Sequence, residues 1–480
     1  MRTMPKHAKP DAPAAPTPAP ASRAPRAVLV AFSAACAIVV LLPLVGMIWA
    51  PTMTTTENRE LAEAPALLED GALNVSYLSD WGDYFEDHFA YRNELVSLNA
   101  LLHARLLGTS SAESVVVGTD GWLYYAGTLS DYCEWELLSD RAIDNIAFNL
   151  SLMQGYVQAQ GATFTVTVAP NKNSLYPEHM PYYYVQGSAR NLDALAEALE
   201  ARGVNYVDLY GAFEQADEVL YYERDSHWNT KGALLATVRI LQAAGKDVSA
   251  LEGLEGSLVG GYVGDLNEML YPVGAVPEGD YSYAASLSWE FVEGDSVEDA
   301  WVETSGAGVG SALVFRDSFG NNMAQFVAAS YETVYFSKYV PYDLTQVASL
   351  GVDDVVVERA ERHLDDWGID PALMPAPSVA LGEVALDAEA SGAVGVEADG
   401  GYDVVSGDVP AAWCDEDVEI YVGVQTGGEV TWYVPFRVST DEGDFGYKAY
   451  ISAEAVDAAD AVWVAVTIDG ETTCVDAWER

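Results

Sequence analysis

The 480-residue chain is short of cysteine, histidine and basic residues, and each shortage argues against a class of protein. It has four cysteines and six histidines but no C-x-x-C pair and no Cys/His cluster, which leaves a structural zinc site without support. It has 23 Lys and Arg against 73 Asp and Glu, a formal net charge of −50. Because so negative a surface repels phosphate backbones, nucleic acid is not expected as a partner. Half of the residues are apolar, enough to bury a large core and more than one domain.

The basic residues that are present gather ahead of a long uncharged run. Residues 1–26 hold five Lys and Arg and one acid in a Pro/Ala-rich sequence that is typical of a disordered tail. Residues 27–50 are apolar over a length that crosses a bilayer as a helix. The run is longer than the core of a cleavable signal and ends in Trp49-Ala50-Pro51, so we expect an uncleaved single-pass anchor in the cell membrane. The positive-inside rule then makes the tail cytoplasmic and the remainder extracytoplasmic.

Two of the four cysteines fall in one C-terminal segment. Cys414 and Cys474 could form a disulfide in an oxidising compartment. Cys36 lies in the apolar run, where a thiol acts as small apolar filler, and Cys133 has no obvious partner.

The spacing of apolar residues predicts the order of the elements. Residues 77–107 have helical spacing, and residues 114–125 have the pattern of a β-hairpin. From about residue 139, helices alternate with short buried strands, and Thr230 is expected to cap the helix over residues 231–244. The pattern predicts a mostly parallel sheet covered on both faces, a three-layer α/β sandwich. In such sheets active sites form in loops at the carboxyl ends of strands.

The residue composition and the spacing of apolar residues change near the C-terminus. Residues 371–378 are rich in proline and are expected to form a linker, and residues 379–480 contain short alternating β runs. We expect a separate β-rich domain there, a candidate carbohydrate-binding module. Trp413 and Trp432 could stack on sugars, although core packing is the simpler explanation.

Ser318 is the sharpest local feature of the α/β region. A strand over residues 312–315 ends just before it, and a helix begins just after it. A hydroxyl at this turn projects from the top of the sheet, and N–H groups at the start of the helix can stabilise an oxyanion. An ordinary N-cap serine explains the same pattern.

Asp225 and His227 supply what a serine nucleophile needs. A two-residue spacing in a loop lets the carboxylate accept a hydrogen bond from the imidazole Nδ1–H, which leaves Nε2 free as general base. A surface histidine beside an acid is the alternative. A metal site that adds Asp208 or Asp217 is a third interpretation, without a recognisable ligand spacing.

These segments resemble a known family. Arg316-Asp317-Ser318-Phe319-Gly320 resembles the serine block of SGNH hydrolases, and Asp225-Ser226-His227-Trp228-Asn229 resembles the D-x-H-W motif of DHHW-type and alginate O-acetyltransferase-like proteins. Further matches, in the family's order, lie within a catalytic domain that we expect over residues 55–370: Glu57-Asn58-Arg59, Asp87-His88-Phe89 with Arg92, Gly118–Tyr124 and Pro170-Asn171-Lys172.

The resemblance implies an SGNH-hydrolase-like enzyme that moves acetyl groups onto an exported polysaccharide. It implies a triad of Ser318, His227 and Asp225, without cofactor or metal, and an acetyl donor supplied by a membrane-bound O-acyltransferase. The amides of Ser318 and Gly320 are expected in the oxyanion hole. The residues expected in the substrate cleft are Lys172, Asn171, Arg316 and Trp228. Arg316 stands where many SGNH enzymes have glycine, so it could crowd or charge the cleft, and a solvated loop lysine is the alternative for Lys172.

Two alternatives to acetyl transfer stay open. With water as acceptor, the same triad makes a carbohydrate acetyl esterase. A protein of another class, a non-catalytic anchor that binds glycans through the β-rich domain and organises an envelope assembly, predicts binding without turnover.

Overall fold

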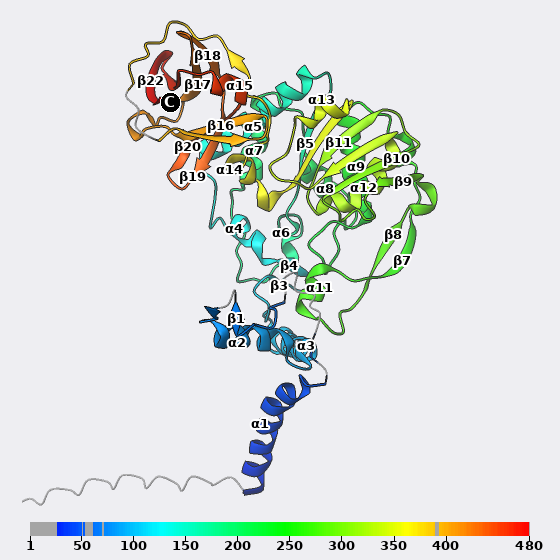
Figure 1. Ribbon diagram of the computed structural model, residues 1–480. Helices are drawn as coiled ribbons and strands as arrows, with labels where there is room; N and C mark the ends of the chain where they lie inside the picture. Colours follow the sequence, from blue (N-terminus) through cyan, green and yellow to red (C-terminus); the bar gives the residue numbers. More distant parts are fainter. Residues whose placement is uncertain (1–25, 50, 53–60, 70–71, 389–392, 480) are drawn as a thin grey trace, which may run out of the picture. The chain divides into compact units, whose positions relative to one another are not determined.

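The computed structural model describes residues 26–49, 51–52, 61–69, 72–388 and 393–479 (Figure 1). The tail over residues 1–25 and the Glu57-Asn58-Arg59 motif lie outside these residues. The chain divides into two compact units, Met1–Leu95 and Val96–Arg480.

The first unit contains the predicted anchor helix. Helix α1 (Arg26–Gly46) has a mean hydropathy of 2.8 and is, among the described residues, the one helix that is long and apolar enough to cross a membrane. Its bounds fit the predicted run over residues 27–50. The helix fits a single-pass membrane anchor or a signal anchor. A short hairpin of β1 (Leu68–Glu69) and β2 (Ala72–Leu73) follows.

The helix predicted over residues 77–107 is interrupted. The structure has α2 (Tyr77–His88), α3 (Arg92–Leu102) and a π-helical turn over His103–Leu107. Tyr91 has a φ of 63°, in the left-handed region, which cannot continue a right-handed helix. The side chain of His88 contacts the carbonyl oxygens of Thr52 and Ala62 at this break, so the prediction of one helix was wrong for a tertiary reason.

A seven-stranded sheet forms the centre of the second unit. Its order is β6-β5-β13-β11-β12-β10-β9; the first five strands are parallel, and β10 pairs antiparallel with both β12 and β9. The strands are β5 (Thr163–Ala169), β6 (Tyr206–Val207), β9 (Trp289–Glu293), β10 (Trp301–Gly306), β11 (Ser311–Phe315), β12 (Thr333–Ser337) and β13 (Asp354–Ala360).

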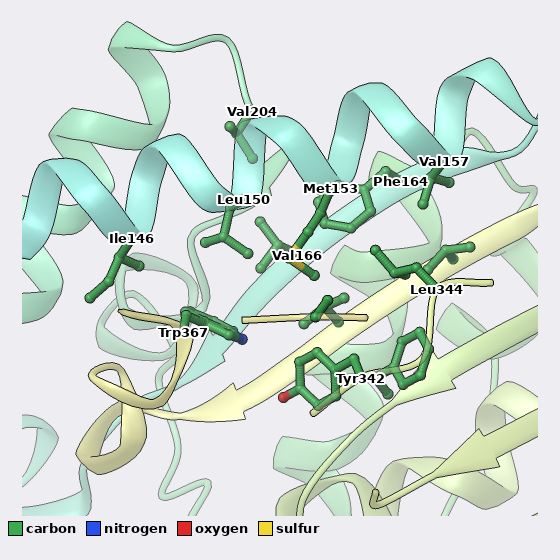
Figure 2. Close-up of a cluster of buried hydrophobic side chains, with 14 of the residues drawn as sticks. Ile146, Leu150, Met153, Val157, Phe164, Val166, Val204, Tyr342, Leu344 and Trp367 are labelled. Atoms are coloured by element: carbon green, nitrogen blue, oxygen red, sulfur yellow. The ribbon is translucent and has the colours of Figure 1, made fainter. Parts of the chain in front are cut away.

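Helices cover both faces of this sheet. Helices α5 (Asp140–Ala159) and α7 (Asn191–Ala201) bury apolar side chains on one face, and α9 (Thr230–Ala243) and α12 (Phe319–Ser330) on the other. Strand β11 alternates between the two clusters, because successive strand residues point to opposite faces. Figure 2 shows the first cluster, where α5 packs on β5. The predicted three-layer α/β fold is confirmed.

Short elements complete this part of the unit. Two hairpins pair β3 (Val115–Val117) with β4 (Leu123–Tyr125) and β7 (Ser257–Tyr262) with β8 (Glu278–Ser282). The short helices are α4 (Leu129–Tyr132), α6 (Lys172–Leu175), α8 (Leu209–Glu214), α10 (Ser249–Glu252), α11 (Asp265–Leu270), α13 (Gln346–Leu350) and α14 (Asp366–Ile369). Asn229, and not Thr230 as predicted, caps α9, because its side chain accepts a hydrogen bond from the amide of Gly232.

The C-terminal part is rich in strands, as predicted. One sheet has the order β14-β18-β17-β21-β22 and the other β15-β16-β20-β19, with a shared apolar cluster. The elements are β14 (Ser378–Val379), β15 (Gly395–Asp399), β16 (Tyr402–Asp408), β17 (Glu419–Thr426), β18 (Glu429–Tyr433), β19 (Phe436–Thr440), β20 (Gly443–Ser452), α15 (Ala453–Asp457), β21 (Ala461–Ile468) and β22 (Glu471–Glu479).

The predicted disulfide is not formed. Cys474 lies on β22 in a cluster with the buried Trp432, whereas Cys414 is exposed after a 3₁₀ turn, and both are free thiols. The two residues belong to different surroundings, although they share one sequence segment. Trp432 is a core residue, while Trp413 is about one-third exposed at 37%.

Asn149 joins the α/β part to the β-rich part within this unit. Its side chain accepts a hydrogen bond from the amide of Arg437 and donates to the carbonyl oxygens of Trp367 and Arg437. Asn149 is fully buried, and Phe436, Val438 and Tyr450 of the β-rich part share the α5 cluster.

We expect Asn149→Leu to destabilise the protein by about 3 kcal/mol, because it leaves buried amide and carbonyl groups without partners. The measurement is the midpoint of urea unfolding. Gln158→Leu, an exposed position on the same helix, is the control, and an equal effect of both variants would contradict the bridging role.

Candidate functional site

The carboxyl ends of three neighbouring parallel strands supply one wall of the site. Strand β11 leads to Ser318, β13 leads to Arg362, and β5 leads to Lys172. Parallel strands end at the same edge of a sheet, so residues far apart in the sequence meet there. The loop between α8 and α9 supplies the other wall with Asp225, Ser226 and His227.

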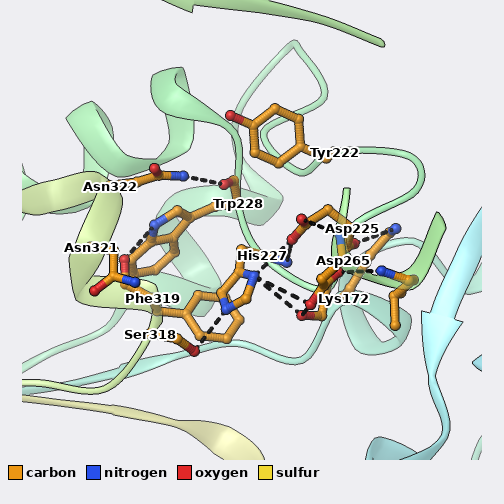
Figure 3. A network of polar contacts seen from close by, with 12 residues as sticks. Lys172, Tyr222, Asp225, His227, Trp228, Asp265, Ser318, Phe319, Asn321 and Asn322 are labelled. Atoms are coloured by element: carbon orange, nitrogen blue, oxygen red, sulfur yellow. Dashed lines mark hydrogen bonds and ion pairs between the residues drawn. The ribbon is translucent and has the colours of Figure 1, made fainter. Parts of the chain in front are cut away.

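Ser318, His227 and Asp225 form a continuous chain of hydrogen bonds (Figure 3). The Ser318 Oγ lies 2.7 Å from His227 Nε2, and His227 Nδ1 lies 2.7 Å from Asp225 Oδ1. With Nδ1–H donating to the carboxylate, Nε2 accepts the proton of the serine hydroxyl. This is the arrangement that activates a serine.

The Asp225 carboxylate is buried and saturated with donors. Oδ1 also accepts a hydrogen bond from the amide of His227, and Oδ2 accepts from the Tyr262 hydroxyl at 2.7 Å and the Asp265 amide at 2.9 Å. Burial acts to raise the pKa of Asp225, but the hydrogen bond and charge of His227, with these donors, lower it well below the usual value. Asp225 therefore stays ionised and holds the imidazole in one tautomer.

The environment makes His227 a stronger base than usual. Burial acts to lower the pKa of His227, but Asp225 and, next, the charge of Asp265 outweigh it and raise the pKa. Asp265 Oδ2 lies 3.7 Å from His227 Nδ1 and accepts a hydrogen bond from the Ser226 hydroxyl. Burial and the neighbouring Asp225 raise the pKa of Asp265 as well.

Asp225, His227 and Asp265 also form the cluster best placed to hold a metal among the described residues, with ligand atoms within 4.8 Å of one another. The metal-site interpretation from the sequence added Asp208 or Asp217 to Asp225 and His227 as a further ligand. Asp208 and Asp217 are both exposed, and Asp208 caps α8. In the cluster, Nδ1 of His227 and both oxygens of Asp225 already bond to groups of this chain. A hydrogen-bonded relay explains these contacts better than a metal site.

Lys172 lies against the backbone of the loop that carries Asp225 and His227. Its ammonium donates to the carbonyl oxygens of Leu123, Glu223 and Asp225 at 2.7–3.0 Å, and it packs on the ring faces of Trp122 and Tyr124. The side chain is buried, and burial lowers the pKa of Lys172 to about 7, although Asp225 opposes the shift. Lys172 therefore fastens the loop to the β3–β4 hairpin. It also lines the small cavity next to Asn171, and its substrate role stays a prediction.

Trp228 and Arg316 are also buried rather than exposed to a cleft. Trp228 is inaccessible to solvent, and its Nε1–H donates to the carbonyl oxygen of Phe319, which ties the loop to α12. Arg316 is 1% exposed and donates to the side chain of Asn321 and the carbonyl oxygen of Val297. Both expectations of substrate contact are wrong, because the sequence does not reveal which way a side chain faces.

Asn171 and Gly320 keep positions beside the site. The backbone N–H of Asn171 donates a hydrogen bond to the carboxylate of Glu361. Asn171, Ser226 and Arg362 are among the residues that line a cavity of about 10 Å³, which has room for one water molecule. Gly320 lies in the first turn of α12, where a Cβ would come within 2.6 Å of Arg316. First-turn amides have no intrahelical acceptor, and Asp317 accepts only the amide of Phe319 in this turn. The amides of Ser318 and Gly320 remain the predicted oxyanion donors.

Three residues of the site were missed by sequence reasoning. Tyr262 and Asp265 come from the end of β7 and the start of α11, and Arg362 lies over the Phe319 ring. Gly264 was an available signal, because a Cβ there would lie 2.4 Å from the carbonyl oxygen of Arg224 in the catalytic loop. Nothing in the sequence names the segment that this glycine approaches.

A family model matches part of this region. Residues 115–270 match the family model described as SGNH hydrolase-like domain, acetyltransferase AlgX. This segment is similar to an SGNH hydrolase-like domain. The match confirms the resemblance predicted from the motifs. The matched segment contains Asp225 and His227 and ends before Ser318.

Curated relatives of this chain are named probable alginate O-acetylase AlgJ. The protein of Pseudomonas syringae pv. tomato is 27% identical over 191 residues, 38% of this chain and 46% of the relative. That of Pseudomonas aeruginosa is 29% identical over 166 residues, 32% of this chain and 40% of the relative. The chain thus spans less than half the length of the curated relatives it matches.

Solved structures give more distant likenesses. PatB1 of Bacillus cereus aligns with a TM-score of 0.43 and 17% identity over 52% of this chain and 96% of that chain. The O-acetyltransferase domain of Pseudomonas putida AlgJ aligns with a TM-score of 0.34 and 19% identity over 52% and 92%. Neither likeness is close enough to bear on the chemistry.

The electrostatic role of Asp265 predicts a shifted pH profile. In Asp265→Asn, the pKa of His227 falls because a facing negative charge is lost. His227 is then neutral, and able to act as a base, at lower pH. We measure the rate at which an aryl sulfonyl fluoride labels Ser318 as a function of pH, and we expect the acid limb of this profile to move to lower pH. Asp217→Asn, an exposed acid, is the control. An unchanged limb in Asp265→Asn would contradict the role.

The contacts of Lys172 predict a loss of nucleophile activation. In Lys172→Met, three backbone carbonyls lose their donor, the loop loosens, and we expect sulfonyl labelling of Ser318 to slow by about tenfold or more. Lys231→Met, a surface lysine paired with Glu218, is the control. Unchanged labelling, with only a higher KM for a sugar acceptor, would favour the substrate role instead.

Proposed function

We propose that this protein is an extracytoplasmic O-acetyltransferase that places acetyl groups on a cell-surface or exported polysaccharide. The observation that carries the proposal is the hydrogen-bonded chain of Ser318, His227 and Asp225, two of which lie in the segment that matches the SGNH hydrolase-like family model. The names of the curated relatives, probable alginate O-acetylases, support acetyl transfer to a polysaccharide.

In the proposed reaction Ser318 carries the acetyl group. Its Oγ attacks the carbonyl carbon of an acetyl ester while His227 Nε2 takes the hydroxyl proton, and the amides of Ser318 and Gly320 bind the developing oxyanion. The bond to the donor oxygen then breaks, and His227 returns the proton to that oxygen. A sugar hydroxyl attacks the acetyl-serine in the same way, which forms the new ester and restores Ser318.

Location and donor form part of the proposal. Five Lys and Arg precede α1 with one acid, so we place the N-terminus in the cytoplasm and the site outside. The ester donor is then delivered at the membrane, by a membrane-bound O-acyltransferase as the family resemblance implies.

We expect Ser318→Ala to lower turnover of an aryl acetate by about 10³-fold or more, because the nucleophile is lost. Purified full-length protein is assayed with and without an oligosaccharide acceptor, and mass spectrometry tests for an acetyl group on Ser318. Ser330→Ala, on the same helix, is the control.

The acceptor arm separates transfer from hydrolysis. Acetylated oligosaccharide supports the transferase, whereas acetate release that the oligosaccharide does not change supports the esterase. Undiminished turnover in Ser318→Ala would contradict the proposed mechanism for both the transferase and the esterase.

A further inference from the structure

Helix α3 and the turn after it carry a row of exposed leucines. Leu98, Leu102 and Leu106 repeat every fourth residue and so lie on one face, with Leu101 and Leu107 beside them. Leu106 and Leu107 are 74% and 66% exposed.

The opposite face of the same helix packs on the protein. Ala100 is fully buried in a cluster with Leu123 and Leu266, and the Ser97 hydroxyl accepts a hydrogen bond from the amide of Val273. Small and polar residues therefore face the body, and leucines face away from it. This is the reverse of the usual amphipathic surface helix.

An aromatic loop extends the row of leucines. The Tyr183 hydroxyl donates to the carbonyl oxygen of Gly108, directly after the turn. Ring contacts continue from Tyr182 to Tyr183, to Tyr184 and to Trp135. Together these exposed side chains form what we call the leucine–tyrosine patch: Leu98, Leu101, Leu102, Leu106, Leu107, Trp135, Tyr182, Tyr183 and Val185.

The charge around the patch differs from that of the whole chain. The chain has a net charge of −50, whereas the exposed charges of residues 92–107 are one acid, Glu94, and one base, Arg105, since Arg92 is buried. Arg105 is exposed among the leucines. Exposed leucines at helical spacing beside exposed tyrosine and tryptophan suit the acyl chains and the headgroup level of lipid.

We propose that the leucine–tyrosine patch inserts into the outer leaflet of the membrane that α1 crosses. The inference rests on the proposed anchoring. Leucines at helical spacing enter the acyl boundary of a bilayer, while tyrosine and tryptophan occupy the headgroup level. Because α1 belongs to the same chain, it keeps the patch at high effective concentration near the lipid. The patch holds the Ser318 part of the chain at the bilayer surface.

The test releases the anchor from otherwise intact protein. Full-length chain, with a specific protease site introduced between residues 52 and 61, is reconstituted into vesicles of phosphatidylcholine and phosphatidylethanolamine. After cleavage, flotation separates bound from released protein. We expect the wild-type fragment to stay bound, and the Leu98→Glu, Leu102→Glu, Leu106→Glu triple variant to show an about tenfold larger released fraction.

The control carries the same substitutions at exposed apolar positions elsewhere. Leu258→Glu, Val292→Glu and Val309→Glu should leave the fragment bound. Circular dichroism establishes that each variant is folded. Ser318→Ala should behave as wild type, so a failure of the acetyl-transfer proposal leaves this result unchanged.

Three outcomes would overturn the inference. They are release of the wild-type fragment from vesicles, equal retention of the triple variant, and retention in native membranes but not in lipid vesicles. The last outcome would assign the patch to a membrane protein. Extraction of the uncleaved chain by alkaline carbonate would refute the anchoring and this inference together.

Discussion

The hydrogen bond between His227 Nδ1 and the buried carboxylate of Asp225 is the contact around which the site is arranged. An ionised carboxylate is costly to bury unless several donors compensate for lost water. Asp225 has four: the amide and ring of His227, the hydroxyl of Tyr262 and the amide of Asp265. The same donors that stabilise the charge also fix the direction of the imidazole. One arrangement thus serves both stability and nucleophile activation.

The loop that carries this pair depends on contacts with distant segments. Lys172 holds two of its carbonyl oxygens together with one from the β3–β4 hairpin, and Trp228 bonds to the backbone of α12. These contacts join the loop to the end of β5 and to the helix that follows Ser318. Rigid support of this kind keeps reacting groups within the few tenths of an ångström that catalysis needs.

The acidic exterior and the leucine–tyrosine patch have different physical roles. A net charge of −50 favours solubility and repels other polyanions. The patch exposes large apolar side chains, and it is the surface that we propose for lipid. With α1 it gives the chain two points of membrane contact, and two contacts limit how the site can turn relative to the bilayer.

Much of the fold was predictable because its causes are local. Strand and helix periods predicted the three layers, a long uncharged run predicted α1, and the two-residue spacing of Asp225 and His227 predicted their contact. The meeting of His227 with Ser318, 91 positions later, was predicted only with the help of a family resemblance, because loop spacing says nothing about distant partners.

What the tertiary structure alone decided is which way side chains face and which distant groups meet. Lys172, Trp228 and Arg316 have the polar or aromatic character of substrate ligands, yet packing turns each of them inward. Cys414 and Cys474 share a segment but not a neighbourhood, and Tyr262 and Asp265 reach Asp225 through a hairpin that no local pattern connects to it. Composition and period determine elements and topology because they act over a few residues. Burial and partner choice depend on the whole packed chain, so only the structure decides them.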